Sequence, residues 1–374
     1  MRKPLLIAFL VLVFSGCTST PPSTSSTPDT DPPTAGPALP QPYTYEAAKQ
    51  LLETEIMTNG LASARGLLTE WMGSSQQVVA ECHLLERHMG FVASTTQATL
   101  DDFGSDCEYG LLHGFIFGLA EKAHTPAEFF AAASPLCLNS AVDSSDAGFC
   151  VHGLGHGFAV ASSNSIHSAL DACNLVPDEY AFPCSGAVLM EFGEDRMSSR
   201  GWSYGHSAEN SPQVLTVQDS DIPGLCVGRP ESCQQWLWMF HVPPRESLDA
   251  DSGSLDTLDA RLAGEVCMTA SLPTAPRDAC LMGFGMFAAM LVPLVDLPGA
   301  WPPTSSLDAD RAARAAVARC SRHPEAGRCL YGLVPPMSSY LYAAAWENIP
   351  DFCAFVDQAT KPDCLLAVET ARNP

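Results

Sequence analysis

The residues CEYGLLHG at positions 107–114 return as CVHGLGHG at positions 150–157, and this repeated stretch decides the fold. Both copies follow the pattern Cys-x2-Gly-x2-His-Gly. Self-similarity at a regular interval is the sequence signature of a repeat protein, in which each copy is one small supersecondary unit. The other cysteines of the chain extend the repeat beyond these two copies.

Fourteen of the fifteen cysteines fall into seven consecutive pairs. Six pairs are separated by 7 to 13 residues, and the second members recur every 34 to 49 residues, a range typical of helical-hairpin repeats. We predict a disulfide in each pair, with the connectivity of the first pair, 25 residues apart, left open. The pairs are Cys82 and Cys107, Cys137 and Cys150, Cys173 and Cys184, Cys226 and Cys233, Cys267 and Cys280, Cys320 and Cys329, and Cys353 and Cys364.

The sequence around each pair predicts a helical hairpin. An alanine-rich helical pattern precedes the first cysteine, as in 126–137, and turn-forming residues such as 143–146 separate the two cysteines. A strongly apolar segment of helical length follows the second cysteine, as in 111–120, and strand patterns are nearly absent. We therefore predict an all-α fold of seven disulfide-stapled helical hairpins, arranged as a curved solenoid or an α/α toroid.

Two positions after each second cysteine carry a pattern. Residues three and six positions on lie on one face of a helix, so we expect both to point toward the same neighbour. The third position is mostly small, which permits close helix approach, and the sixth is histidine or methionine in five units. The third positions are Gly110, Gly153, Ala187, Trp236, Gly283, Gly332 and Ala367; the sixth are His113, His156, Met190, Met239, Met286, Pro335 and Thr370.

Over residues 107–370 this arrangement resembles the α/α toroids of the lanthionine-synthetase-like type, whose inner helices also open with Gly and His-Gly motifs. The resemblance concerns architecture. The zinc ligands of that family include a Cys-His-Gly run, whereas here Cys82 and His83 are followed by Leu84. Neither the zinc site nor the cyclase activity of the family is carried over.

The histidines are concentrated in the first units of the repeat. His152 and His156 are four residues apart, which places two imidazoles on one helical face, as metal sites often do. We predict a site for a metal ion or metal cofactor built from His83, His113 and His156, with His152 or His88 as a fourth ligand or supporting partner. Zinc, copper and haem are the candidate cofactors, and methionines at the sixth positions would suit copper or haem.

The same residues have a second interpretation. Histidines at helix starts can cap, pack or hydrogen-bond, and methionines can fill the core, so the chain would be an interaction scaffold with structural His-Gly motifs. A metal-dependent enzyme is a third hypothesis, with no catalytic residue assigned. Glu86, Glu108 and Glu191 are the carboxylates near the histidine units; each is a candidate acid or base, or else a helix N-terminal or solvated charge.

The first residues predict a lipoprotein. Arg2 and Lys3 precede an apolar run over 5–14 that is too short to span a bilayer, and the following Ser-Gly-Cys17 resembles the lipobox of bacterial lipoproteins. The resemblance implies cleavage before Cys17, a lipid on its thiol and an extracytoplasmic, membrane-anchored location. We predict a signal peptide over 1–16, the lipidated cysteine with a disordered Pro/Ser/Thr stalk over 17–43, and the helical-hairpin domain over 44–374.

The net charge of −23 at pH 7 argues against nucleic acid, or an anionic membrane surface, as a partner of the folded body. We expect the lipid anchor to be its contact with the membrane. Polar insertions over 194–223, 243–254 and 297–306 predict a recognition face for a protein or cationic partner.

Three aromatic residues in the insertions, Trp202, Tyr204 and Trp301, are candidate partner contacts, with packing against the nearest helix as the alternative. Residues 201–205, GWSYG, match a nucleophile-elbow pattern. The elbow needs a strand before it and a helix after it, and both are missing from the sequence pattern, so we interpret the match as a surface loop.

Overall fold

The computed structural model describes residues 37–94, 106–138, 144–163, 165–202, 217, 222, 225–226, 230–242, 244, 267, 274–296, 306–322, 326–338, 352–356 and 358–372. Every regular element in these ranges is a helix, which confirms the all-α class. The predicted signal peptide, the lipidation site and most of the stalk lie outside the described residues.

Three helices open the described part of the chain: α1 (Tyr45–Asn59), α2 (Leu61–Ser74) and α3 (Gln76–Ala93). Side-chain caps start two of them, because Thr44 Oγ1 accepts the Ala47 N–H and Ser75 Oγ accepts the Val78 N–H. Cys82 lies on α3, so this helix carries the first cysteine of the first pair.

The elements with first cysteines in later units are α5 (Pro126–Cys137), η3 (Cys173–Leu175) after α7 (Ile166–Ala172), α13 (Ser306–Cys320) and η9 (Phe352–Phe355). The helices that carry or follow the second cysteines are α4 (Gly110–Lys122) after η2 (Asp106–Tyr109), α6 (Ser144–Ala161), α8 (Ala181–Ser199), α9 (Pro230–Trp236), α12 (Thr274–Asp296), α14 (Ala326–Ser338) and α16 (Lys361–Arg372). The short α10 (Trp238–His241) follows α9, and η4 (Asp178–Tyr180) precedes α8.

All seven disulfides form between the predicted partners, including Cys82 and Cys107. The Cα atoms of the pairs lie 5.1 to 5.8 Å apart, a separation that a disulfide spans without backbone movement. Each bridge links adjacent helical segments. Seven disulfides in one chain indicate an oxidising, extracytoplasmic compartment.

The sequence placed the start of several second helices too late. Residues 143–146 were expected to be a turn, but α6 begins at Ser144, two turns before Cys150. In α8, α9, α14 and α16 the second cysteine is the fourth residue of the helix. The disulfides therefore join the first cysteine to an early turn of the second helix, and polar residues before that cysteine are already helical.

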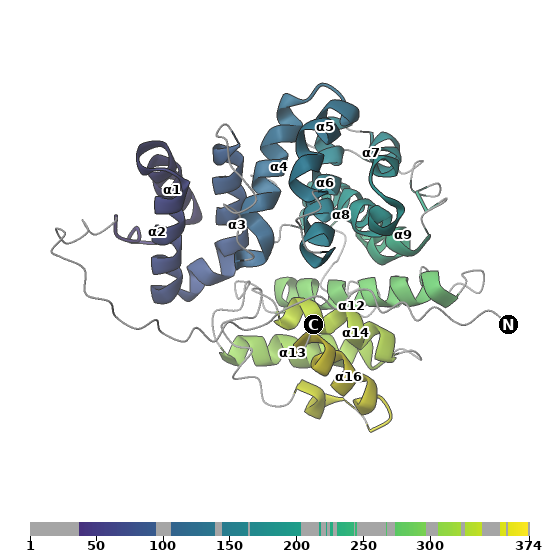
Figure 1. Cartoon of the computed structure of the whole chain (residues 1–374). Helices are drawn as coiled ribbons and strands as arrows, with labels where there is room; N and C mark the ends of the chain where they lie inside the picture. The colour runs from purple at the N-terminus through teal and green to yellow at the C-terminus, as the bar shows by residue number, and fades with distance from the viewer. Residues whose placement is uncertain are drawn as a thin grey trace.

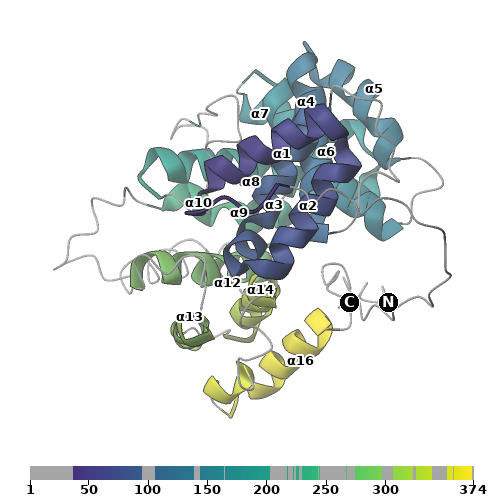
Figure 2. The ribbon, with the colours of Figure 1, turned by 90° about the vertical axis from the view of Figure 1, so that its left-hand side faces the viewer.

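The second helices contact one another in chain order, from α4 to α6, α8, α9, α12, α14 and α16. Figures 1 and 2 show α12, α13, α14 and α16 together below the group formed by α1 to α9. One hydrophobic cluster runs from α1 to α16, and a small second cluster holds Cys267, Cys280 and Leu281. Within the described residues, no helix combines the length and apolar character needed to cross a membrane.

Candidate functional site

Four of the five histidines predicted as ligands lie together, on α3, α4 and α6. The ring centroid of His113 lies 5.6 Å from the ring centroid of His83, 5.7 Å from that of His152 and 5.6 Å from that of His156. The centroids of His152 and His156 are 4.8 Å apart. His113 and His156 are buried, and His83 and His152 are partly exposed at the edge of the cluster. We call these four residues the histidine cluster.

The fifth predicted ligand, His88, lies elsewhere. Its Nε2 is 3.3 Å from Glu53 Oε2 on α1, so its ring faces the N-terminal helix. Burial and the nearby Lys49 charge lower the pKa of His88, against the opposing effect of Glu53. The prediction of His88 as a fourth ligand is therefore not supported by its position, because its partner is a carboxylate of α1.

Glycines at the predicted small positions bring the helices of the cluster together. A Cβ on Gly110 would lie 2.5 Å from the His83 carbonyl oxygen, and one on Gly153 would lie 3.0 Å from His113 Cδ2. A Cβ on Gly114 would overlap the Arg87 carbonyl group. In these two units the third and sixth positions share a neighbour, because Gly110 and His113 both face His83 of α3, and Gly153 and His156 both face His113 of α4.

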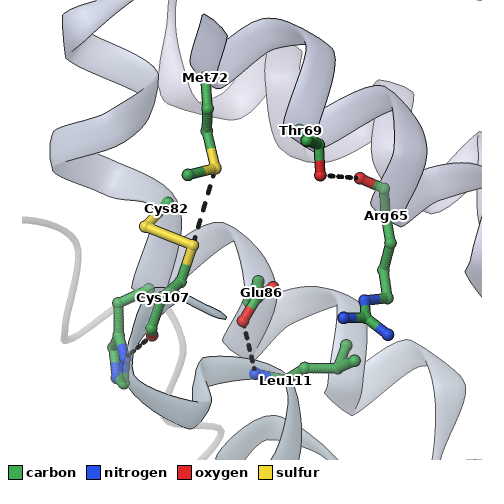
Figure 3. Close-up of a disulfide and its surroundings, with 8 residues drawn as sticks. Arg65, Thr69, Met72, Cys82, Glu86, Cys107 and Leu111 are labelled. Carbon is green, nitrogen blue, oxygen red and sulfur yellow. Dashed lines mark hydrogen bonds between the residues drawn. A yellow bond between two sulfur atoms is a disulfide. The ribbon is translucent and has the colours of Figure 1, made fainter. Parts of the chain in front are cut away.

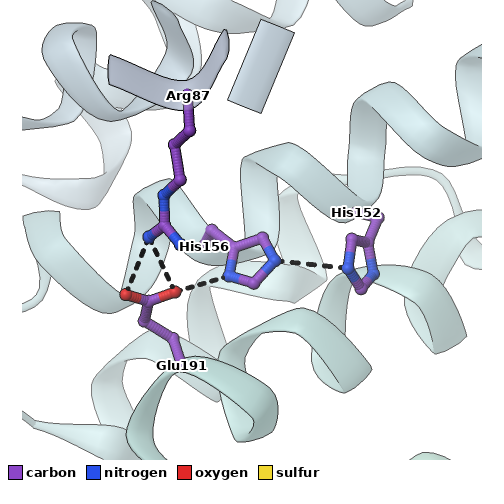
Figure 4. Close-up of polar contacts among 4 residues, drawn as sticks. All are labelled: Arg87, His152, His156 and Glu191. Carbon is purple, nitrogen blue, oxygen red and sulfur yellow. Dashed lines mark hydrogen bonds and ion pairs between the residues drawn. The ribbon is translucent and has the colours of Figure 1, made fainter. Parts of the chain in front are cut away.

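A buried ion pair supports one side of the cluster (Figure 4). Arg87 Nη2 donates to both oxygens of Glu191, at 3.1 and 3.3 Å, and Glu191 Oε2 lies 2.8 Å from His156 Nδ1. The three residues come from α3, α8 and α6. Burial alone would raise the pKa of Glu191, but Arg87 and the His156 hydrogen bond outweigh it and lower the pKa to about 2. Glu191 is therefore an ionised acceptor, and its contact with His156 is the Nδ1–H donating to a carboxylate.

The hydrogen bonds determine where the ring protons of His152 and His156 lie. Because Nδ1 of His156 carries the proton given to Glu191, Nε2 of a neutral His156 has a lone pair. His152 hydrogen-bonds the backbone of Pro183, which can only accept, and its Nε2 faces His156, so Nδ1 is the donor. The two Nε2 atoms lie 3.2 Å apart, so either a proton held between them in an N–H···N hydrogen bond or a bound cation can bridge the two nitrogens.

Burial favours the neutral form of three of these imidazoles. Burial lowers the pKa of His83 to about 4 and that of His152 to about 3, and it also lowers the pKa of His113. The neighbouring His156 adds to the shift in all three. Neutral imidazole is the form that ligates metal ions. His113 Nε2 is buried and has no hydrogen-bond partner among the described residues.

Figure 3 shows the disulfide of the first unit, with Met72 and Glu86 near it. Cys107 is bonded to Cys82, and its carbonyl oxygen accepts the His83 Nδ1–H at 2.9 Å. Glu86 Oε2 accepts the Leu111 N–H at 3.4 Å in the first turn of α4. The predicted role of Glu86 as a helix N-terminal charge is thus the one its contact supports. The side chain of Glu108 lies outside the described residues.

The position of Glu191 differs from its interpretation as a helix N-terminal or solvated charge. The sequence left open a solvated or helix N-terminal charge, but Glu191 is buried in the middle of α8 and pairs with Arg87. Arg87 and Glu194 were not singled out at all. Glu194 is buried one turn after Glu191, and burial together with the Glu191 charge raises its pKa to about 8. A single arginine and a second carboxylate in apolar helices are weak sequence signals.

The remaining candidates divide between core and undescribed residues. Met239 is buried in the core, and Met190 and Met286 pack against it, which supports their interpretation as core residues. Trp202 is only 1 % exposed and belongs to the core cluster, which favours the packing alternative over a partner contact. Tyr204 and Trp301 lie outside the described residues, as does most of the elbow-like segment.

Among the described residues, no group of three or more His, Cys, Asp or Glu side chains already stands in metal-binding geometry. The pair formed by His152 and His156 is the closest approach of two ring nitrogens recorded in the cluster. Comparisons with protein-family models, with curated proteins and with solved structures find no match to this chain. Function is therefore inferred from the geometry and chemistry of the histidine cluster.

Proposed function

We propose that the protein binds a transition-metal ion through the histidine cluster. The observation that carries the proposal is the 3.2 Å separation of the Nε2 atoms of His152 and His156. Two nitrogen ligands at ~2.0–2.1 Å from a tetrahedral ion are about 3.3–3.4 Å apart. An ion seated between these two nitrogens would replace their N–H···N hydrogen bond by two coordinate bonds.

His113 is the third ligand in this proposal. Its ring lies at similar distances from His152 and His156, and its Nε2 has no hydrogen-bond partner among the described residues. A change in its side-chain torsions on binding would complete a three-nitrogen site, with His83 beside it at the partly exposed edge. Zinc and copper are the ions that suit a set of imidazole donors.

Glu191 has the place of the carboxylate that supports a metal-ligating histidine. In metal sites such a histidine commonly gives its other N–H to a carboxylate, which sets the tautomer and the ring orientation. The 2.8 Å contact between His156 Nδ1 and Glu191 Oε2 has this form. The ion pair with Arg87 keeps the carboxylate ionised and in place.

The test uses the full chain, produced in an oxidising compartment and stripped of metal with a chelator. Calorimetric titration with zinc and with copper should give one site, and His152→Ala or His156→Ala should each weaken binding by about 100-fold or more because half of the nitrogen pair is lost. His167→Ala, at an exposed position of α7, is the matched control. Elemental analysis and absorption of the untreated protein test for resident metal and for haem.

A chain that binds neither ion, or binds both equally well after His152→Ala and His156→Ala, would contradict the metal function. The interaction scaffold with structural His-Gly motifs would then be the better description. Both descriptions share the helical body, and in both we propose that the seven units continue as one curved stack. The ordered contacts between successive second helices favour this arrangement, and small-angle X-ray scattering distinguishes an open curve from a closed ring.

We further propose that the body is tethered by a lipid on Cys17. The basic start, the short apolar run and the lipobox-like Ser-Gly-Cys support the anchor. In a bacterial host the protein should sediment with membranes, and Cys17→Ala should remove the lipid and release it. A Cys17→Ala variant that still carries lipid and stays with the membrane fraction would contradict the anchor.

A further inference from the structure

Arg87 touches none of the four histidines through a hydrogen bond that the structure records, yet its position determines what Glu191 can do. Its side chain is 8 % exposed, and Nη2 reaches both carboxylate oxygens of Glu191 across 104 residues of sequence. The planar guanidinium also lies 4.1 Å from the ring centroid of Phe117 on α4. A carboxylate on one side and an aromatic face on another leave the guanidinium little freedom.

The backbone brings this arginine into the site. Gly114 lies against the Arg87 carbonyl group, where any Cβ would overlap it. Gly90, three residues after Arg87, lies equally close to the Leu111 carbonyl of α4. At these two contacts the backbones of α3 and α4 touch. Helix packing therefore determines where the Arg87 side chain lies relative to α6 and α8.

A buried ion pair of this kind is weak evidence of a stabilising role. Removing two charges from water costs several kcal/mol per ion, and apolar replacements of similar volume are often neutral or stabilising. Arg87 Nε is, in addition, buried with no hydrogen-bond partner among the described residues. The pair is therefore better explained by what it orients, and the group it orients is the Nδ1–H of His156.

We propose that Arg87 is a positioning residue of the metal site: it fixes the Glu191 carboxylate, which holds His156 in the ring orientation and tautomer that present Nε2 to the ion. The inference deepens the proposed metal function and rests on it. The metal affinity then depends on a side chain that does not contact the metal. Losing such a supporting contact typically costs 10- to 100-fold in metal affinity.

The experiment compares Arg87→Met, Arg87→Lys, Glu191→Gln and Arg87→Met/Glu191→Gln in the full chain, with zinc and copper titrations as before. Arg87→Met and Glu191→Gln should each weaken binding by about 10- to 100-fold, and the double variant should lose little more, because both act through His156. Arg87→Lys should recover part of the loss, since it keeps the charge without the fork. Losses that add in the double variant would overturn the proposal.

Arg196→Met is the matched control for removal of a buried arginine. Arg196 lies on α8, the helix of Glu191, and its guanidinium donates to the backbone carbonyls of Phe240 and Val217, at 3.0 and 3.1 Å. Its loss should lower the melting temperature and leave the metal affinity within about 3-fold of wild type. A loss of affinity equal to that of Arg87→Met would show that destabilisation alone explains both.

A metal-free readout separates this inference from the proposed function. Nitrogen-15 NMR of the histidines in the stripped protein should show His156 as the Nδ1–H tautomer in wild type and as a mixture of tautomers in Arg87→Met. If the wild type binds no metal but this change occurs, the metal function fails and the positioning by Arg87 stands. If the wild type binds metal and Arg87→Met changes neither affinity nor tautomer, the positioning role fails by itself.

Discussion

At the scale of single residues, Glu194 is a carboxyl group whose burial in the folded protein opposes its ionisation. It is 8 % exposed on α8 and lies near Glu191, Asp195 and Arg87. Burial, with the Glu191 charge second, raises the pKa of Glu194 from 4.5 to about 8. The folded protein therefore keeps a proton on Glu194 that the unfolded chain releases above about pH 4.5.

Glu194→Gln should stabilise the protein, and more at pH 8 than at pH 5. Between pH 4.5 and about 8 the unfolded state binds fewer protons at this position than the folded state, so folding stability falls as the pH rises. Glutamine resembles the protonated carboxyl and has no proton to lose. Because one pKa unit corresponds to about 1.4 kcal/mol, the gain at pH 8 should be on the order of a few kcal/mol.

Thermal unfolding followed by circular dichroism at the two pH values measures the effect. Glu179→Gln, at an exposed position in η4, is the control and should shift the melting temperature little at either pH. An equal gain for Glu194→Gln at pH 5 and pH 8 would show that the carboxyl is not held protonated in the folded protein.

The sequence predicted residues of the histidine cluster at positions that recur in successive units, and it missed contacts between residues that follow no repeat. Alignment on the second cysteines singled out His113 and His156, and helical spacing added His152. Arg87 and Glu191 lie 104 residues apart, so no local pattern connects them. His88 was grouped with the others because it is close in sequence, but it faces α1 from a different side of α3.

At the scale of helices, backbone contact between α3 and α4 is the feature that positions the site. Gly114→Ala should destabilise the protein by about 3 kcal/mol or more, because the new methyl group would overlap the Arg87 carbonyl and force the two helices apart. Gly66→Ala is the control on α2, where a Cβ meets nothing within 4 Å. It should gain about 0.5–1 kcal/mol from the better helix propensity of alanine.

Chemical unfolding of both variants measures these changes, and the metal titration of Gly114→Ala adds a functional readout. A Gly114→Ala protein as stable as wild type would mean that the backbones of α3 and α4 are not in contact at Gly114 and Arg87. The sequence predicted close approach of α4 at Gly110, the third position, but not at Gly114, and it predicted α5 to the residue. It placed the start of α6 too late, because Ser and Asp also favour the first turn of a helix.

At the scale of the whole molecule, the seven disulfides staple successive units along one hydrophobic cluster. Reduction by a dithiol should abolish cooperative unfolding near room temperature, because each bridge contributes typically ~2–4 kcal/mol by restricting the unfolded chain. Circular dichroism before and after reduction measures the loss. Alkylation with mass spectrometry verifies that all seven bridges have opened.

Retention of the same melting transition after full reduction would contradict this expectation. Helix packing alone would then hold the body together. A partial result is also informative: if the first unit loses order while α12 to α16 keep theirs, the repeat unfolds unit by unit, as nearest-neighbour packing in repeat proteins permits.

The sequence by itself predicted the helical class, six of the disulfide pairs with the partner of Cys82 left open, and the face of the second helices that carries histidine. These features depend on spacing along the chain, which cysteine intervals and helical periodicity record directly. Only the tertiary structure decided that His88 lies apart from the other histidines, that Trp202 is buried, and that Arg87 and Glu191 support His156. Those relations arise when α3, α6 and α8 pack against one another, and the meeting of side chains from distant helices leaves no periodic trace in the sequence.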